Sequence, residues 1–456
     1  MPGEQEVVDE SGAPEAPDGA PDGSSAANPF VEQPADPPED HEAVGHRGWR
    51  ASLAPLRHRN YALVWSAGFV SNIGTWMETV AVGDLVAKNT GEAGWTALVA
   101  AAGFLPMGLL GPVGGAMADR VDRRKMLILM TLAQMVFAGT LAVLSATGHA
   151  TPGAVALTVF GAGCVAGLGF PAYSAMLPDL VPKKDLLAAM SLSQAQWNLG
   201  RVIGPALAGI AIGLGSYTAA FTVNTASFAV MLVALQALRL PHREPSTDTD
   251  GLFTRMKVGA KAAWAEPGVR SSIILIASVA LTASPFIALI PAMARVRFDG
   301  DPHLTARFVT AQGIGAVAGA LVLPALADRF GRYRMLLVSF VALPVALVLY
   351  GLAPTPNAAT LALVGVGATY MFTFSGIGTT VQLRAPAELR ARVLSFYFLA
   401  LGTLYPIGAT IQGPIADKVG LGEVTALSGA ALLLVIGTIR VVRPERIRAM
   451  ADPVAA

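Results

Sequence analysis

The feature that most constrains this chain is the length of its uncharged stretches. Residues 126–178 run for 53 positions without a Lys, Arg, Asp or Glu, and residues 335–383 are likewise uncharged. Hydrophobic residues make up 53% of the chain and charged residues only 14%, against about 25% charged in soluble domains. A soluble fold could not cover so much apolar surface. The sequence therefore predicts an all-α integral membrane protein.

Twelve membrane helices are expected, because a helix that crosses a bilayer needs about 20 mostly apolar residues. Four uncharged segments each fit one helix: 93–118, 271–294, 308–327 and 393–416. Three longer stretches each supply two helices, since glycine- and proline-containing turns divide them near 147–153, 213–216 and 353–357. Segments 61–87 and 424–439 complete the twelve.

The distribution of basic residues predicts the orientation of these helices. With the N-terminus inside, 26 of the 32 Lys and Arg residues fall on the cytoplasmic side and five on the outer side. Since Lys and Arg concentrate in cytoplasmic loops, both termini are expected in the cytoplasm. The composition, rich in alanine, glycine and arginine, is typical of bacteria with GC-rich genomes. We therefore expect a multi-pass protein of the bacterial cytoplasmic (inner) membrane.

Polar segments divide the chain into five regions. Residues 1–50 are an acidic tail, whose first 46 positions hold 12 acidic residues and no Lys or Arg, so we expect a disordered cytoplasmic segment. Residues 51–239 and 271–443 are two six-helix halves. A cytoplasmic linker, 240–270, joins them and includes a predicted short helix on the membrane surface at 256–265. Residues 444–456 form a second cytoplasmic tail.

An internal repeat relates the two halves. Residues 118–127 match residues 327–336 at six of ten positions, with a constant offset of 209. Gly204 and Pro205 recur as Gly413 and Pro414 at the same offset. Parallel six-helix repeats are typical of one large class of secondary transporters.

These residues resemble the major facilitator superfamily over about residues 55–443. Its signature loop between helices 2 and 3 is matched by Gly115, Asp119, Arg120, Arg123 and Arg124, and by Asp328, Arg329 and Arg332 in the second copy. The segments 56–61, 72–81 and 177–182 most resemble the branch of enterobactin exporters and macrolide efflux pumps. A helix 5 motif typical of exporters is matched by Gly200, Gly204, Pro205, Ala208 and Gly209, with Ala208 where a second glycine is usual.

The two motifs imply a gating mechanism. Gly200, Gly204 and Ala208 recur every fourth residue, so one face of helix 5 admits close helix packing, whether for gating or for ordinary contact. Pro205 withdraws an amide and permits a kink. In this fold Asp119 would lie near the start of helix 11, where the helix dipole favours an anion. With the neighbouring arginines it would close the cytoplasmic face, although Arg124 is also explained by topology alone.

Three charges lie inside predicted membrane helices: Glu78, Asp84 and Arg201. Each costs at least about 2.5–3.5 kcal/mol at the helix centre unless it is solvated or paired. Glu78 and Arg201 are expected at similar depths and to approach each other across a water-accessible cavity. Glu78 is the predicted proton carrier, with a static ion pair as the alternative. Asp84 lies four residues before Lys88, which favours a structural pair.

The substrate cavity is expected to combine aromatic and amide side chains, although packing explains each one equally well. The candidates come from helices 1, 4, 5, 10 and 11: Asn72, Trp76, Tyr173, Gln194, Asn198, Tyr370, Phe374, Gln382 and Tyr397. This mixture suits a large amphipathic organic molecule.

The sequence thus predicts a secondary transporter that exports a drug-like or siderophore-like molecule in exchange for protons. An importer remains open, as do an intramembrane enzyme and a membrane sensor that transports nothing. The enzyme is disfavoured because no prenyl-transfer, zinc-protease, serine-hydrolase or P-loop motif is present. We expect a monomer whose partners are the lipid bilayer, a small organic substrate and protons, without cofactor, metal or nucleic acid.

Overall fold

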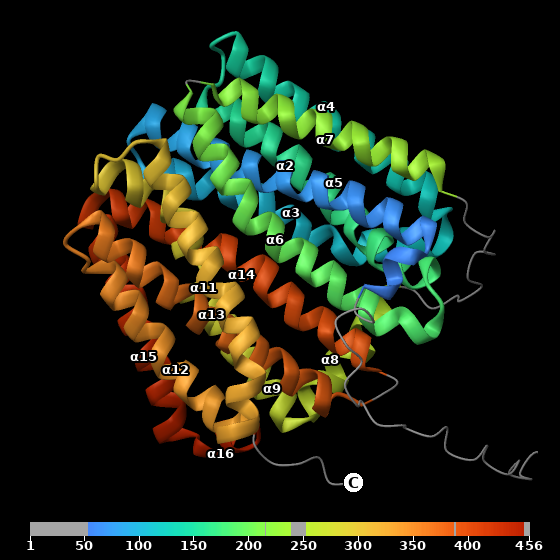
Figure 1. The fold of residues 1–456 in the computed structure, drawn as a ribbon. Coiled ribbons are helices and arrows are strands. Elements are labelled where there is room, and N and C mark those ends of the chain that lie inside the picture. Colours follow the sequence, from blue (N-terminus) through green and yellow to red (C-terminus); the bar gives the residue numbers. More distant parts are fainter. Residues whose placement is uncertain (1–52, 215, 239–251, 387–388, 451–456) are drawn as a thin grey trace, which may run out of the picture. The chain divides into compact units, whose positions relative to one another are not determined.

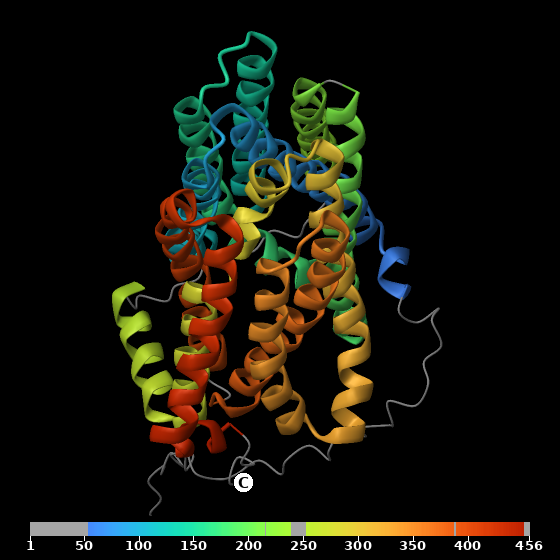
Figure 2. The ribbon, with the colours of Figure 1, turned by 90° about the vertical axis from the view of Figure 1, so that its left-hand side faces the viewer.

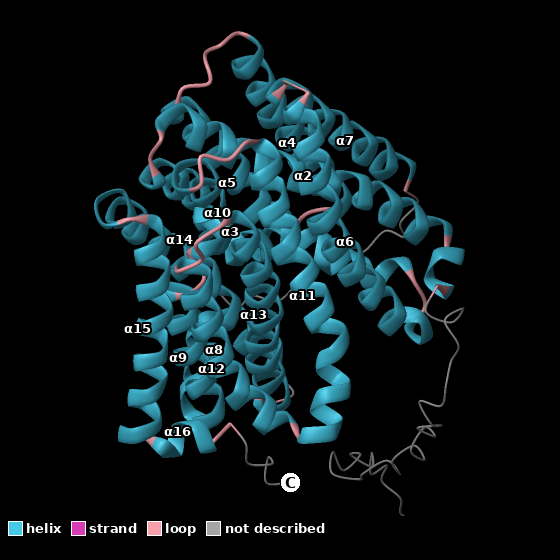
Figure 3. Cartoon of the chain, turned by 60° about the vertical axis from the view of Figure 1, so that its left-hand side comes forward, coloured by secondary structure: helices cyan, strands magenta, loops and turns pink. Residues whose placement is uncertain are grey.

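The computed structural model describes residues 53–214, 216–238, 252–386 and 389–450. Every regular element in these ranges is a helix, and short loops join the helices (Figure 3). The all-α class is therefore confirmed for this part of the chain. The elements are η1 (Ala54–Arg57), α2 (Arg59–Thr90), α3 (Ala93–Arg120), α4 (Arg123–Ala146), α5 (Pro152–Met176), η2 (Leu177–Leu180), η3 (Lys183–Asp185), α6 (Leu186–Gly213), α7 (Tyr217–Ala237), α8 (Leu252–Ala265), α9 (Pro267–Thr282), α10 (Phe286–Ala292), η4 (Met293–Arg297), α11 (Pro302–Phe330), α12 (Arg332–Gly351), α13 (Pro356–Arg384), α14 (Arg390–Val419), α15 (Leu421–Val442) and α16 (Pro444–Arg448).

Within the described ranges, ten helical segments are long and apolar enough to cross a membrane. The long helices α2 and α6 are not among them, although they contain 32 and 28 residues. These two helices carry the three intramembrane charges predicted from the sequence. The polar residues that make α2 and α6 unusual are thus the ones with the greatest functional interest.

Side-chain caps explain where several helices begin. Asp122 accepts a hydrogen bond from the Lys125 amide at the start of α4, and Asp301 accepts one from the Leu304 amide at the start of α11. Such caps satisfy amides that have no partner inside the helix. The predicted turns after α4, α6 and α12 are all present, because α5, α7 and α13 begin at Pro152, Tyr217 and Pro356.

One predicted helix is interrupted. A single helix was expected over 271–294, but α9 ends at Thr282 and α10 begins at Phe286. Pro285 has no amide hydrogen to continue the helix. Ser284 instead donates its amide to the Val279 carbonyl at 2.9 Å. The segment remains one candidate membrane span, Pro267–Arg297, but its helix is interrupted between Thr282 and Phe286.

Helices α2–α7 form one group, called the N-terminal group, and helices α9–α15 form the C-terminal group (Figure 1). The same pairings occur in both. The second helix packs on the fourth (α3 on α5, α11 on α13), the third on the sixth (α4 on α7, α12 on α15), and the first on the fifth (α2 on α6, α9 on α14).

The two groups meet through α3 with α14, and through α6 with α11. A Cβ on Gly413 would lie 2.7 Å from the Ala97 Cβ, and a Cβ on Gly209 would lie 2.5 Å from the Ala306 Cβ. We call this region, which also contains Asp84, the Asp84 end. From it the two groups diverge toward the opposite end, called the Arg123 end after the arginine that begins α4 (Figures 1 and 3).

Large apolar side chains cover the outer faces of the helices. Leu157 of α5, Leu361 of α13 and Leu434 of α15 are each more than 70% exposed. A soluble protein rarely exposes so many large apolar residues together. These surfaces are suited to contact with lipid chains.

The predicted linker contains the helix α8, which begins four residues earlier than expected, at Leu252. It packs mainly against α14 and α9 and lies beside the C-terminal group (Figure 2). The acidic tail predicted over 1–50 lies outside the described residues. So do residues 239–251 of the linker and 451–456 of the C-terminal tail.

Candidate functional site

Arg201 lies where the two helix groups meet. Its Nη2 atom donates a 2.7 Å hydrogen bond to Oε1 of Gln312, which extends from α11 in the other group. Its guanidinium also lies 5.5 Å from the ring centre of Trp76 on α2. Arginine over an indole face is a favourable cation–π arrangement. The two contacts hold the charge between α2, α6 and α11.

Aromatic side chains of the C-terminal group lie near this arginine. Tyr370 of α13 and Tyr405 of α14 lie within electrostatic range of Arg201. Tyr370 stacks on Phe374 at 6.5 Å, and its hydroxyl lies 3.1 Å from Ser284 Oγ. The predicted candidates Tyr370 and Phe374 therefore belong to one aromatic cluster facing the cation.

Tyr397 belongs to the same cluster but is a packing residue. It is 1% exposed, and its hydroxyl donates to the Phe374 carbonyl at 2.9 Å. With its polar atom already bonded to backbone, it has little left to offer a ligand. Tyr397 was predicted as a substrate contact, but in this structure its hydroxyl bonds the backbone at Phe374.

Glu78 lies on another face of α2. Its Oε2 atom accepts a 2.7 Å hydrogen bond from Asn224 of α7, a residue that is 1% exposed. Asn224 is bonded in turn to Ser227 through Oδ1 at 3.1 Å. Glu78 is thus held inside the N-terminal group rather than between the groups.

The expected approach of Glu78 to Arg201 is therefore wrong for this conformation. Among the described residues, neither Glu78 nor Arg201 forms an ion pair. Glu78 is hydrogen-bonded to Asn224, and Arg201 is hydrogen-bonded to Gln312. The reason is helical rotation, because Trp76, which faces Arg201, lies about 160° around α2 from Glu78 at 100° per residue. The stripe that includes Glu78 faces α7.

Asp84 is fully buried in a network that joins the two groups. Its carboxylate binds Arg295 in a bidentate pair, with Nε to Oδ1 at 2.7 Å and Nη2 to Oδ2 at 2.6 Å. Tyr217 and Thr305 each donate a hydroxyl to it at 2.6 Å. Charge-assisted bidentate bonds of this kind are among the strongest in proteins.

This arrangement corrects the expected pairing of Asp84 with Lys88. Lys88 instead lies 5.5 Å from the ring centre of Tyr217. Arg295 was counted as a charge outside the membrane helices, but it reaches from η4 into the network at the Asp84 end. The expected Asp84–Lys88 pair joined neighbours in sequence, whereas the observed Asp84–Arg295 pair joins residues that are close only in the folded chain.

The small residues of the helix 5 motif pack mostly inside the N-terminal group. A Cβ on Gly200 would clash with the Asn72 side chain, and one on Gly204 would lie 2.8 Å from the Ile73 carbonyl oxygen. Ala208 is fully buried in a hydrophobic cluster to which every helix of the N-terminal group contributes. Pro205 lies inside α6. Gly209 faces the other group, since a Cβ there would lie 2.5 Å from the Ala306 Cβ, whereas Gly200 and Gly204 pack on α2.

Among the described side chains, two arginines of the predicted cytoplasmic gate have partners within the N-terminal group. Arg123 binds the Ala175 carbonyl at 3.0 Å and Asp179 at 3.1 Å, both in its own group. Arg124 caps the end of α7 through the carbonyls of Leu235 and Gln236, a role more specific than topology. The side chain of Asp119 lies outside the described residues. A Cβ on Gly115 would lie 3.9 Å from Pro171 Cβ. The exposed members are Arg120, Asp328, Arg329 and Arg332.

The remaining predicted cavity residues are dispersed. Asn72 is 7% exposed and donates to the Gln196 and Trp197 carbonyls, which ties α2 to α6. Tyr173 hydrogen-bonds Gln196. Asn198 bonds the Gln194 carbonyl in its own helix. Gln194 and Gln382 are exposed. Among the described interactions, none of these five side chains is bonded to Arg201.

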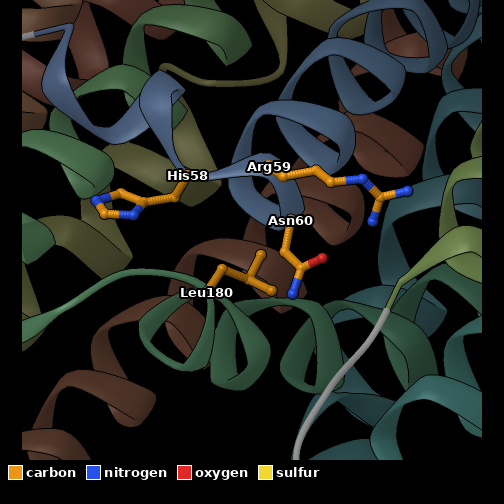
Figure 4. Close-up of a pocket in the computed structure, with 4 residues that line it drawn as sticks. All are labelled: His58, Arg59, Asn60 and Leu180. Atoms are coloured by element: carbon orange, nitrogen blue, oxygen red, sulfur yellow. The ribbon is translucent and has the colours of Figure 1, made fainter.

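A pocket of about 470 Å³ lies at the start of α2 and is lined by His58, Arg59, Asn60 and Leu180 (Figure 4). His58 Nε2 lies 2.8 Å from Asp185 Oδ2. This contact ties the first helix to the segment that precedes α6. The pocket lies at the Arg123 end and away from the central arginine.

Sequence reasoning missed the residues that complete the two buried polar clusters. They are Tyr217, Ser284, Arg295, Thr305, Gln312 and Tyr405. Gln312 offered a signal, since it is an amide within an otherwise apolar helix segment. Arg295 offered a weaker one, because it lies at the border of an apolar stretch.

Membrane-crossing helices in two packed groups, with buried charges where the groups meet, define a multi-pass membrane transporter acting on small molecules. Over residues 50–452 the sequence matches the family model described as Transmembrane secretion effector, and the chain belongs to this family. The resemblance to the major facilitator superfamily and its macrolide and enterobactin efflux branch is confirmed.

Relatives along nearly the whole length carry efflux names. Macrolide efflux protein A of Streptococcus pyogenes is 23% identical and covers 82% of this chain and 93% of its own. The multidrug efflux pump Tap of Mycolicibacterium fortuitum is 26% identical, covering 84% and 95%. The enterobactin exporter EntS of Salmonella typhimurium is 26% identical, covering 87% and 97%.

Solved structures share the fold. The nucleoside transporter NupG superposes with a TM-score of 0.65 at 13% identity, covering 86% of this chain and 99% of its own. A D-xylose–proton symporter gives a TM-score of 0.66 at 14% identity, covering 85% and 98%. At these identities the likeness extends to the fold alone.

Proposed function

We propose that this protein is a secondary transporter that exports drug-like or siderophore-like organic molecules across a bacterial cytoplasmic membrane by alternating access, driven by protons. The observation that carries the proposal is the buried Asp84–Arg295 network, which joins the two helix groups at one end only. A polar network in that place suits a gate, because it can be broken and remade as the groups move. The export direction follows the efflux proteins among its relatives.

A transporter built from two six-helix halves requires twelve membrane spans. Helices α2 and α6 add to the ten apolar segments, and at about 1.5 Å per residue their 32 and 28 residues are long enough to cross. The matching helix pairings in the two groups support an origin as six-helix repeats. The excess of basic residues in the loops at the Arg123 end supports placing that end, and both termini, in the cytoplasm.

The conformation described here is then closed to the outside and open to the cytoplasm. At the outer, Asp84 end, Asp417 of α14 caps the start of α3 by accepting the Ala93 and Gly94 amides at 2.6 and 2.9 Å. At the cytoplasmic end, Arg123 and Arg124 bind within their own group. Outward opening would release the Asp84 network, and the predicted cytoplasmic gate would form instead.

Glu78 is the proposed proton carrier, although its route to the gate differs from the one expected from sequence. It contacts α7, the helix whose first residue, Tyr217, donates to Asp84. Protonation of Glu78 would weaken its charge-assisted bond to Asn224 and loosen α2 against α7. Movement between these helices is a direct way to affect the Asp84 network.

The test of the proposed function is accumulation in cells that lack their major efflux pumps. The intracellular accumulation of antibiotics and iron chelators is measured in cells with and without the gene, before and after addition of a proton uncoupler. The proposal predicts lower accumulation of at least one compound, restored by the uncoupler. Equal accumulation for every compound, or export that is unaffected by the uncoupler, would contradict it. An Asp84→Asn variant at equal expression serves as the inactive control.

A further inference from the structure

The centre of the molecule presents hydrogen-bond donors without a matching anion. Arg201 is bonded to the neutral amide oxygen of Gln312, and the ion pairs of the described residues do not include it. Glu78 is engaged by Asn224 on another face of α2. A positive charge in the membrane region without a carboxylate partner points to a ligand that supplies the counter-charge.

Two further donors near this charge have no protein acceptor. The Nε2 atom of Gln312 and the Nε1 atom of Trp76 are buried and make no hydrogen bond among the described residues. Gln312 is only 1% exposed, and its bond to Arg201 fixes Oε1 toward the guanidinium, so the amide nitrogen must face elsewhere. Buried donors are normally paired.

The cluster spans the moving parts of the molecule. Trp76 and Arg201 belong to the N-terminal group, and Gln312 belongs to the C-terminal group. A ligand bound by all three side chains would therefore be released when the groups move apart or rotate. This is what a transported substrate requires, and it argues against a permanent structural ion.

Aromatic rings surround the donors. Trp197 meets Trp76 edge to face at 5.8 Å, and Tyr370 of the C-terminal group, which stacks on Phe374 at 6.5 Å, lies within electrostatic range of Arg201. Such rings bind flat apolar or aromatic bodies well. The donors fix one end of a ligand and the rings hold the remainder.

We infer that Arg201, Gln312 and Trp76 form an oxyanion-binding site, and that the exported substrates carry a carboxylate or phenolate beside an aromatic or apolar body. This inference rests on the proposed export function and narrows its substrate class. The guanidinium supplies charge and paired donors, which suit a carboxylate, and the amide and indole N–H groups supply the remaining bonds.

The experiment uses the purified full chain in nanodiscs and three matched probes: 1-naphthaleneacetate, its neutral amide, and the cation 1-naphthylethylamine. Binding is followed by quenching of tryptophan fluorescence. The carboxylate is expected to bind at least about tenfold more tightly than either other probe, the scale of one good charge-assisted contact. Equal affinity for the three probes would overturn the inference.

Two variants locate the site. Arg201→Gln is expected to abolish the preference for the carboxylate. Gln312→Glu keeps Arg201 but places a carboxylate beside it, so the preference should be lost while the melting temperature is maintained or raised. The control, Lys418→Gln, removes a cation at the end of α14 and should leave the preference unchanged. A preference that survives both Arg201→Gln and Gln312→Glu would overturn the assignment.

A transport measurement separates this inference from the proposed function. Proteoliposomes are loaded with the same probes, and counterflow is measured. Carboxylate-selective binding without counterflow would retain the site and contradict export. Counterflow of all three probes at equal rates would retain the transporter and contradict the oxyanion site.

Discussion

For single residues, the Asp84–Arg295 pair is a bidentate, charge-assisted link between the two groups. The Asp84 side chain is fully buried and the Arg295 side chain is 15% exposed, so removal of the carboxylate leaves a partly buried guanidinium uncompensated, which costs at most about 3–5 kcal/mol. We expect Asp84→Asn to lower the melting temperature of the detergent-solubilised protein by several degrees. The double variant Asp84→Asn with Arg295→Gln should recover part of the loss. Additive losses in this double-mutant cycle would show that the pair is not coupled.

Glu78 gives a second prediction at this scale. Glu78→Gln retains an oxygen that can accept from Asn224 but can no longer gain or lose a proton. We expect substrate binding and expression to be preserved, while uptake into inside-out vesicles driven by a pH gradient falls at least about tenfold, since a coupled proton no longer moves.

The matched control is Glu92→Gln, at the exposed junction between α2 and α3. Its transport should equal that of the unmodified protein. Undiminished proton-driven uptake by Glu78→Gln would remove the carrier role.

Residue contacts within a helix were open to prediction from spacing, and contacts between helices were not. The periodicity of α2 placed Glu78 on a polar stripe, but the rotation of that stripe toward α7 depends on how Gly74 packs against Asn224 and Ser227. Likewise, Arg295 and Gln312 lie 211 and 111 positions from their partners Asp84 and Arg201. Nothing in the local pattern identifies such partners.

For the helices, the close packing of α6 on α2 depends on Gly204. A Cβ on Gly204 would lie 2.8 Å from the Ile73 carbonyl oxygen and 3.0 Å from the Met77 amide nitrogen, both backbone atoms. Because backbone cannot give way as a flexible side chain does, we expect Gly204→Val to reduce folded yield strongly in fluorescence-detected size exclusion.

The control is Gly365→Val in α13, where a Cβ would meet nothing within 4 Å. A valine there faces open space and carries only the modest cost of a β-branched residue in a helix. Equal yields of the two variants would contradict the packing assigned to α6.

Helix limits were largely predictable, because charged runs and glycine- or proline-containing turns mark them in the sequence. Helices α3 and α14 begin within a few residues of the expected positions 93 and 393. The break between α9 and α10 was not foreseen, since Pro285 is also tolerated inside membrane helices when neighbours satisfy the freed groups. Here Ser284 turns toward Tyr370 instead, a contact that depends on α13.

For the molecule as a whole, alternating access requires the two groups to separate at the Asp84 end during each transport cycle. The pair Gly94→Cys with Asp417→Cys, in a Cys164→Ser background, places thiols on α3 and α14, where a Cβ on Gly94 would lie 2.8 Å from Oδ2 of the Asp417 carboxylate that the second thiol replaces. A disulfide there would hold this end closed.

The comparison pair is Gly139→Cys with Thr225→Cys, which joins α4 and α7 inside the N-terminal group, where a Cβ on Gly139 would lie 3.7 Å from Thr225 Cγ2. Since both helices move together in the proposed cycle, this bridge should form without loss of transport. It controls for the effects of oxidation and of the substitutions themselves.

The most direct measurement is therefore substrate export by the Gly94→Cys, Asp417→Cys protein before oxidation, after oxidation and after reduction. Alternating access predicts that export stops when the bridge closes and returns when it is reduced, while the comparison pair exports throughout. Full export with the bridge quantitatively closed would contradict the account.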